Sequence, residues 1–208
     1  MPSTPFYNWF GLNQTLFFAI YGIRGVYLDQ LMLLGSRLGD FRNLPWIIGA
    51  LVFMFVVRTV ASGTDHLRWL PERKTIIQLL LTLLAGYILA AILVTLLKVW
   101  LHMPRPPVAI TIAPVHVLGE PESIYSFPSG HAAFAMLLAV VLWPHCRNPS
   151  RVLLILFAVW VGVSRINIGA HFPPDVIAGY LCGAFSGWIA TRFLTPHFDN
   201  ACDLPPGQ

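Results

Sequence analysis

Three short polar motifs interrupt an otherwise apolar sequence, and each carries side chains that could act on a phosphate group. Residues 98–106 read KVWLHMPRP, residues 126–131 read SFPSGH, and residues 164–175 read SRINIGAHFPPD. Lysine and arginine bind phosphate oxygens, and a guanidinium group does so with two parallel hydrogen bonds. If the fold brings the three motifs together, they predict an anion-binding site.

The cations of this site are Lys98, Arg105 and Arg165, each beside an apolar stretch. A single basic residue at such a position commonly extends its head towards lipid headgroups and needs no other ligand. Here the nearby carboxylates are too few to neutralise all three charges. The cluster therefore favours a bound anion.

The second motif is typical of a helix start, because Ser129 can cap a helix that continues into the apolar run after Gly130. The first amides of a helix have no partner within it and favour an anion. Gly130 also lets a ligand approach the backbone closely. Taken alone, however, this motif is better explained by an ordinary cap without a ligand.

The third motif pairs His171 with Asp175. Pro173 and Pro174 disfavour an uninterrupted helix between them, so we expect His171 on a loop and Asp175 in the first turn of the next helix. A carboxylate there can accept the imidazole N–H and determine which ring nitrogen faces a substrate. With His131 as a second histidine, the motifs predict a phosphoryl-transfer site that has a nucleophile and an acid.

Metal binding is the competing use of histidines, and His102, His116, His131 and His171 could all lie on one face. No carboxylate pair or cysteine accompanies them at the spacing of a metal site. The three cysteines are scattered and form no disulfide framework. Because fixed cations would also repel a metal ion, we expect neither a catalytic metal nor a cofactor.

The elements that position these motifs must lie in a membrane. Of the 208 residues, 56% are hydrophobic and 11% are charged, against about 25% charged residues in an ordinary soluble domain. A soluble protein with so few charges would expose large apolar patches. We therefore exclude a soluble enzyme, a disordered chain and a nucleic-acid-binding protein. The net charge of +4 does not call for a polyanionic partner.

Apolar stretches of about 20 residues predict membrane-spanning helices. Five are expected, at residues 45–61, 75–97, 131–143, 152–163 and 176–191. The stretch 12–38 is also apolar but holds Arg24 and Asp29 near its middle, where charges are costly. It is either a sixth, irregular span or an interfacial helix followed by a short buried one. We expect an all-α integral membrane bundle of about six helices, forming a single domain over residues 1–208.

Basic residues predict the orientation of the bundle. The loops after the first and third of the five spans hold Arg68, Arg73, Lys74, Arg147 and Arg151. By the positive-inside rule these loops face the cytoplasm. The opposite side also carries basic residues, but they are offset by four carboxylates, Asp40, Glu120, Glu122 and Asp175. We expect a bacterial inner-membrane or plasma-membrane protein whose motifs face the periplasm or the exterior.

The three motifs resemble the signature of the type 2 phosphatidic acid phosphatase superfamily, the membrane lipid phosphate phosphatases. That signature is K-x6-R-P, then P-S-G-H, then S-R-x5-H-x3-D, and all three parts occur unbroken and in order over residues 98–175. The resemblance implies an all-α six-helix membrane fold and metal-independent catalysis. It also implies that phosphate is held by Lys98, Arg105, Ser129, Gly130 and Arg165.

The resemblance further implies a role for each remaining signature residue. His171 would attack phosphorus and carry a phosphohistidine, Asp175 would orient it, and His131 would protonate the leaving group. The expected substrate is a lipid of the bilayer, foremost undecaprenyl diphosphate, cleaved to undecaprenyl phosphate and phosphate. Phosphatidylglycerol phosphate, phosphatidic acid and lipid A remain alternatives, as does phosphate transfer to an acceptor lipid. A transporter or structural membrane protein would instead place its ionisable residues near the bilayer middle.

Overall fold

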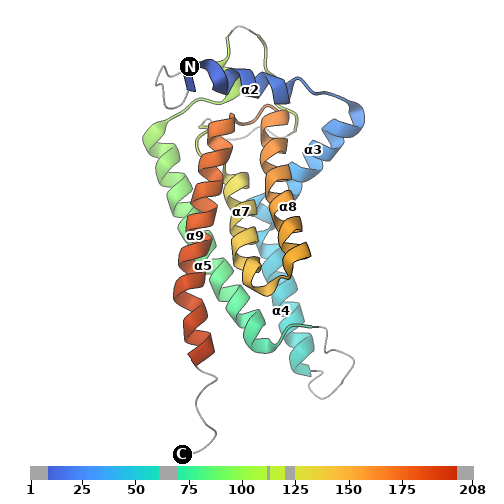
Figure 1. The fold of residues 1–208 in the computed structure, drawn as a ribbon, viewed down its shortest axis with the longest axis vertical. Helices are drawn as coiled ribbons and strands as arrows, with labels where there is room; N and C mark the ends of the chain where they lie inside the picture. Colours follow the sequence, from blue (N-terminus) through green and yellow to red (C-terminus); the bar gives the residue numbers. More distant parts are fainter. Residues whose placement is uncertain (1–8, 61–69, 112, 120–124, 201–208) are drawn as a thin grey trace, which may run out of the picture.

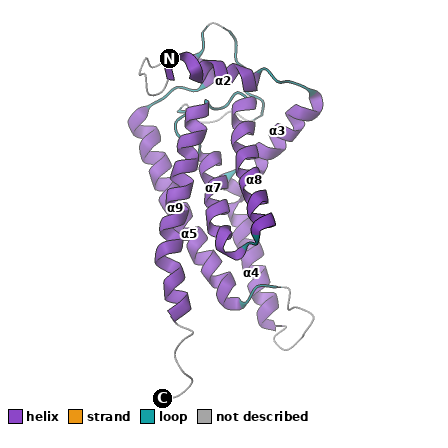
Figure 2. Cartoon of the chain, in the orientation of Figure 1, coloured by secondary structure: helices purple, strands orange, loops and turns teal. Residues whose placement is uncertain are grey.

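The computed structural model describes residues 9–60, 70–111, 113–119 and 125–200, with side chains as far as residue 194. Every regular element in these residues is a helix, as Figure 2 shows. The all-α class is therefore confirmed. The longer helices are α2 (Leu12–Tyr21), α3 (Val26–Leu38), α4 (Leu44–Val60), α5 (Arg73–Leu101), α7 (Gly130–Leu142), α8 (Asn148–Asn167) and α9 (Pro173–Asn200). The short ones are η1 (Trp9–Gly11), η2 (Phe41–Asn43), α6 (Pro106–Ala109) and η4 (Trp143–His145).

Helix α7 lies in the core of the bundle (Figure 1). It packs against α5, α8 and α9, and its side chains Phe134 and Leu137 are almost completely buried. The surrounding helices point large apolar side chains outwards, and more than half of each is exposed at Leu96, Leu153 and Leu181. Because such an exterior is unfavourable in water, the bundle is an integral membrane fold.

Each of the five expected spans falls on a helix, but the expected number of spans is not confirmed. By length and apolar composition, three of the described helical segments can cross a membrane, namely Phe41–Val60, Arg73–Leu101 and Asn148–Asn167. A fourth is obtained if the bent pair α2 and α3 counts as one span. Helix α7 with η4 is shorter than a bilayer crossing requires, whereas α9 continues well beyond the expected end at residue 191.

The N-terminal stretch 12–38 is divided into two helices that are bent by 117°. Helix α2 lies across one end of the bundle, and α3 descends from it beside α8 (Figure 1). The break holds Gly22 and Gly25, which weaken a helix, together with Arg24, whose guanidinium lies 3.6 Å from the carboxylate of Asp29. The bend thus places both charges at the end of the bundle. This stretch is not one straight span.

Helices α7 and α9 approach each other closely because α9 places glycines on the shared face. A β-carbon at Gly179 would lie 2.4 Å from the carbonyl oxygen of Ser129, and one at Gly183 would lie 2.1 Å from that of Ala133. Small residues four positions apart permit such backbone contact between membrane helices. At the end of this contact the amide of Ser129 donates to the carbonyl oxygen of Asp175 at 2.9 Å. The second and third motifs are therefore joined through their backbones.

Gly183→Ala should lower the melting temperature of the detergent-purified protein. The added methyl group would meet backbone atoms, which cannot move aside as a flexible side chain can, and overpacking of this kind costs about 1–3 kcal/mol. The matched control is Gly49→Ala on α4, where nothing lies within 4 Å of the added β-carbon and the change should be neutral or stabilising. An unchanged melting temperature in Gly183→Ala would contradict the close packing of α7 on α9.

Candidate active site

The three motifs converge at the end of the bundle over which α2 lies (Figure 1). The first is at the end of α5, the second at the start of α7, and the third joins α8 to α9. Between α5 and α7 the chain encloses a pocket of about 280 Å³. The motif residues that line it are Lys98, Arg105, Gly130, His131 and His171. Five of the eight expected site residues therefore line one pocket.

His171 lies on the loop between α8 and α9 and is 1% exposed. Its Nδ1 lies 3.2 Å from Oγ of Ser126 and 3.4 Å from Oδ2 of Asp175. Asp175 is in the first turn of α9, where its Oδ2 accepts hydrogen bonds from the amide of Phe172 at 2.8 Å and from the hydroxyl of Ser126. The ring is thus held on one side by a buried hydroxyl and a buried carboxylate.

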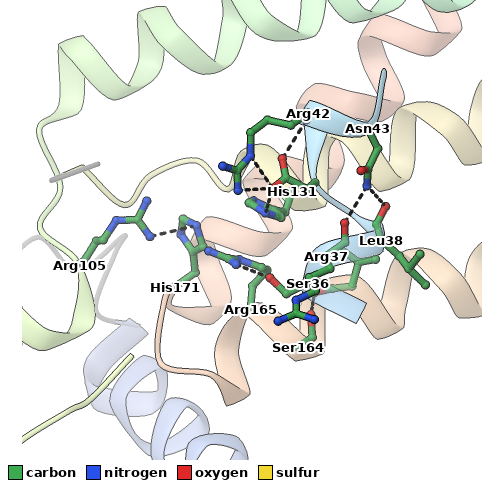
Figure 3. Close-up of polar contacts among 12 residues, drawn as sticks. Ser36, Arg37, Leu38, Arg42, Asn43, Arg105, His131, Ser164, Arg165 and His171 are labelled. Carbon is green, nitrogen blue, oxygen red and sulfur yellow. Dashed lines mark hydrogen bonds and ion pairs between the residues drawn. The ribbon is translucent and has the colours of Figure 1, made fainter. Parts of the chain in front are cut away.

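The contacts of the two ring nitrogens determine the tautomer of His171. Nη1 of Arg105 lies 3.4 Å from Nε2 (Figure 3), and because a guanidinium only donates, Nε2 must be the acceptor. The proton therefore resides on Nδ1. Burial and the positive charges of Arg105, Arg165 and Lys98 hold the pKa of His171 well below its usual value of 6.5. At neutral pH the side chain is a neutral imidazole whose Nε2 carries the lone pair and faces Arg105, which also lines the pocket.

The three cations are held by oxygen atoms from distant segments. Nζ of Lys98 donates to the carbonyl oxygen of Tyr125 at 2.9 Å, and Nη1 of Arg105 donates to that of Ala170 at 2.8 Å. Arg165 is 3% exposed, and its Nη1 donates to Oγ of Ser36 on α3 at 2.6 Å. Arg165 is not among the residues that line the pocket, but its charge acts on His171.

Helix α7 begins at Gly130 with Ser129 as its N-cap residue, as the sequence predicts. The hydroxyl of Ser129 does not cap the helix, and among the described residues nothing forms a hydrogen bond with it, although it is buried. The amide of Ser129 is directed at Asp175 and not at the pocket. Ser129 is not among the residues that line the pocket, whereas Gly130 lies at the pocket itself.

His131, in the first turn of α7, faces Asp40, which the sequence indicates only as one of four carboxylates on the side opposite the basic loops. Its Nε2 lies 3.8 Å from Oδ2 of Asp40, and the ring of Phe41 packs edge-on against the imidazole with centroids 6.1 Å apart. His131 is 7% exposed. Both catalytic histidine candidates are therefore buried beside a carboxylate.

Three further residues that sequence reasoning missed contact the expected site residues: Ser126, Ser36 and Asp40. Ser126 lies within the second motif, three residues before Ser129, and its position there was a usable signal. Ser36 and Asp40 come from the N-terminal stretch, where nothing in the sequence connects them to the motifs. Among the described residues, no three metal-ligating side chains are grouped together. Glu120 and Glu122 lie outside the described residues.

The sequence and the fold of this chain are similar to those of known proteins. The model of the PAP2 superfamily matches residues 79–199, more than half of the chain. The undecaprenyl-diphosphatase of Sulfolobus acidocaldarius is 29% identical over 182 residues, which cover 88% of this chain and 78% of that protein.

Two crystal structures resemble the whole bundle. That of Aquifex aeolicus LpxE has a TM-score of 0.70 and 31% identity, and the match covers 88% of this chain and 96% of that one. A transmembrane PAP2-type phosphatidylglycerolphosphate phosphatase of Bacillus subtilis has a TM-score of 0.66 and 24% identity over 93% of this chain and 87% of its own. At 24% identity, the similarity to the Bacillus subtilis structure shows only a shared fold.

Proposed function

Because the chain belongs to the PAP2 superfamily and is therefore a membrane phosphatase of lipid phosphate esters, we propose that it hydrolyses undecaprenyl diphosphate to undecaprenyl phosphate and inorganic phosphate. The observation that carries this substrate is the lining of the pocket. Among the described lining residues, only Tyr87 and Thr95 add polar side-chain atoms to those of the motifs. A headgroup of phosphate alone fits this lining, because a sugar or glycerol headgroup needs further hydrogen-bonding partners.

The apolar part of the same pocket supports a lipid with a hydrocarbon tail. From the motif residues it continues between α5 and α7 along Ala90, Val94, Phe134 and Leu137. Apolar side chains stabilise a hydrocarbon tail without specifying a headgroup. The likeness to an undecaprenyl-diphosphatase over 88% of the chain supports the same choice of lipid.

His171 is the proposed nucleophile. Its Nε2 attacks the terminal phosphorus, the P–N bond forms as the P–O bond to the lipid phosphate breaks, and undecaprenyl phosphate leaves. Ser126 and Asp175 hold the Nδ1 proton and stabilise the positive charge that develops on the imidazole. The lone pair on Nε2, the buried ring and its lowered pKa support this role.

His131 is the proposed acid and base. It gives a proton to the leaving oxygen in the first step and takes one from water in the second, when water breaks the P–N bond and releases inorganic phosphate. Lys98 and Arg105 stabilise the phosphoryl oxygens from within the pocket. Gly130 and the hydroxyl of Ser129, at the start of α7, also bind the phosphoryl oxygens. Arg165 adds its positive charge, which acts on His171.

His171→Ala should abolish turnover, and Asp175→Asn should leave a small residual rate, since it removes the orienting charge but not the nucleophile. The matched control is His145→Ala in η4, just before the turn that joins α7 to α8, which should keep full activity. Since His171 becomes protonated only well below pH 6.5, kcat/KM should show no loss from this group at pH 6.5. Chelators should not inhibit. Full activity of His171→Ala, or inhibition by a chelator that added metal reverses, would disprove this mechanism.

The substrate is tested by comparing kcat/KM for undecaprenyl diphosphate, phosphatidylglycerol phosphate, phosphatidic acid and lipid A in matched detergent micelles. We expect the diphosphate to be preferred, and inorganic phosphate to account for all phosphate lost from it. A tenfold preference for another lipid, about 1.4 kcal/mol in the transition state, would overturn the choice of substrate. Phosphate recovered on a second lipid would identify a phosphotransferase.

The proposed location of the pocket is the periplasmic or outer side of the membrane, which requires the turn between α7 and α8 to face the cytoplasm. Cys146 lies in that turn. His116 lies near α2 at the other end, where its backbone N–H donates to the hydroxyl oxygen of Tyr21 at 3.0 Å. In intact cells, an impermeant thiol reagent should label His116→Cys in a chain without other cysteines, and should not label Cys146 as the only cysteine. The reverse pattern would place the pocket on the cytoplasmic side.

A further inference from the structure

The junction between α3 and α4 brings a buried carboxylate to the edge of the pocket, outside all three motifs. Asp40 is 8% exposed, and its Oδ2 lies 3.8 Å from Nε2 of His131. We propose that Asp40 is a positioning residue, which orients His131 and stabilises its protonated form so that His131 can protonate the leaving group. This inference rests on the proposed function and on the role proposed there for His131.

The carboxylate of Asp40 is fixed by its own neighbour in sequence. It accepts hydrogen bonds from the amide of Arg42 at 2.8 Å, from Nε at 2.8 Å and from Nη2 at 2.6 Å (Figure 3). The side chain of Arg42 is 72% exposed. The ion pair of Arg42 with Asp40 thus connects the exposed surface to the buried His131. A carboxylate held by three donors is preorganised towards His131 and needs little rearrangement to act on it.

The backbone that carries Asp40 is also held tightly. Nδ2 of Asn43 donates to the carbonyl oxygens of Arg37 at 2.7 Å and Leu38 at 3.1 Å, which closes the end of α3 (Figure 3). A β-carbon at Gly39 would lie 2.3 Å from Cγ1 of Val161, so the junction lies directly against α8. The position of Asp40 is therefore set by packing on both sides.

Asp40 carries its negative charge at neutral pH. Burial alone would raise the pKa of Asp40, but the hydrogen bonds from Arg42 and the charge of His131 outweigh burial and lower it. A carboxylate within about 4–6 Å of an imidazole favours the imidazolium form. The distance of 3.8 Å is that of an ion pair and not of a hydrogen bond, and catalytic contacts commonly shorten when substrate binds.

Several other charges face the space around His131 and bear on its protonation. Among the described residues, the charged and titratable groups that line the pocket or flank this histidine are Asp40, Arg42, Tyr87, Lys98, Arg105 and His171. The cations oppose an imidazolium, whereas the bound phosphate of a substrate favours it. Asp40 supplies a negative charge 3.8 Å from Nε2 of His131 before substrate arrives.

The role of Asp40 is tested by comparing Asp40→Asn on substrates with different leaving groups. This substitution keeps the size of the side chain and removes its charge. With dodecyl phosphate, whose alkoxide must be protonated as it leaves, kcat/KM should fall about tenfold, a part of the effect of general acid catalysis. With 4-nitrophenyl phosphate, whose leaving group needs no proton, it should fall less than twofold. In a His131→Ala background, Asp40→Asn should have no further effect on this ratio.

The pH dependence gives a second readout with opposite signs for two variants. Activity is lost at alkaline pH as the acid His131 loses its proton. Asp40→Asn should therefore move the alkaline loss of kcat/KM to a pH about one unit lower. Arg42→Ala removes the positive charge that partly neutralises the carboxylate of Asp40, and it should move the alkaline loss of kcat/KM to higher pH. Damage to the fold would not produce opposite shifts. Should Asp40→Asn fail to fold, Asp40→Glu tests the same point: moving the carboxylate by one methylene group should change the leaving-group ratio, and an unchanged ratio would contradict the role of Asp40.

Asp29→Asn is the matched control, because Asp29 is also an ion-paired carboxylate of the N-terminal stretch but pairs with Arg24. It should change neither the leaving-group ratio nor the pH profile. If the unaltered protein releases no phosphate from any lipid phosphate, the proposed function fails. If it is active, and Asp40→Asn and Arg42→Ala leave both readouts unchanged, only the role of Asp40 fails.

Discussion

The close contact between α7 and α9 is the constraint on which the site depends. Gly179 and Gly183 let the two backbones meet, and the amide of Ser129 then reaches the carbonyl oxygen of Asp175. This contact sets the start of α7, which carries His131, against the start of α9, which follows His171 directly. A side chain at either glycine would separate the two histidines. The spacing within each motif has chemical meaning only because this packing brings the motifs together.

Within that frame, the charges around His171 determine its chemistry. Three cations and burial keep the imidazole neutral. In the proposed mechanism this neutral form is the nucleophile, and Asp175 and Ser126 stabilise the positive charge that forms when it attacks. The same cations bind phosphate oxygens. One arrangement thus supplies the lone pair and attracts the group that it attacks. An isolated neutral histidine in an apolar site would have the first property without the second.

The sequence predicted this pocket better than it predicted the path of the chain. The motifs predicted His171 on a loop, Asp175 in a first turn and Ser129 before a helix, because prolines, glycine and capping residues act locally. Hydropathy located the helices but not the number of spans, since α7 is short and the stretch 12–38 bends at its glycines. Ser36 and Asp40 could not be predicted, because their contacts with Arg165 and His131 are formed only by tertiary packing.

The contacts of Ser36 and Asp40 join two parts of the chain. Ser36 and Asp40 lie before residue 79, where the match to the PAP2 superfamily begins, yet each contacts a residue of the signature. In the proposed mechanism, the groups that meet the phosphate all belong to the signature. Arg165 is held by Ser36 on α3, and by the role proposed for Asp40 the protonation of His131 depends on the junction between α3 and α4. The role proposed for Asp40 therefore implies that changes in the N-terminal segment alter the rate with a given leaving group without altering the signature itself.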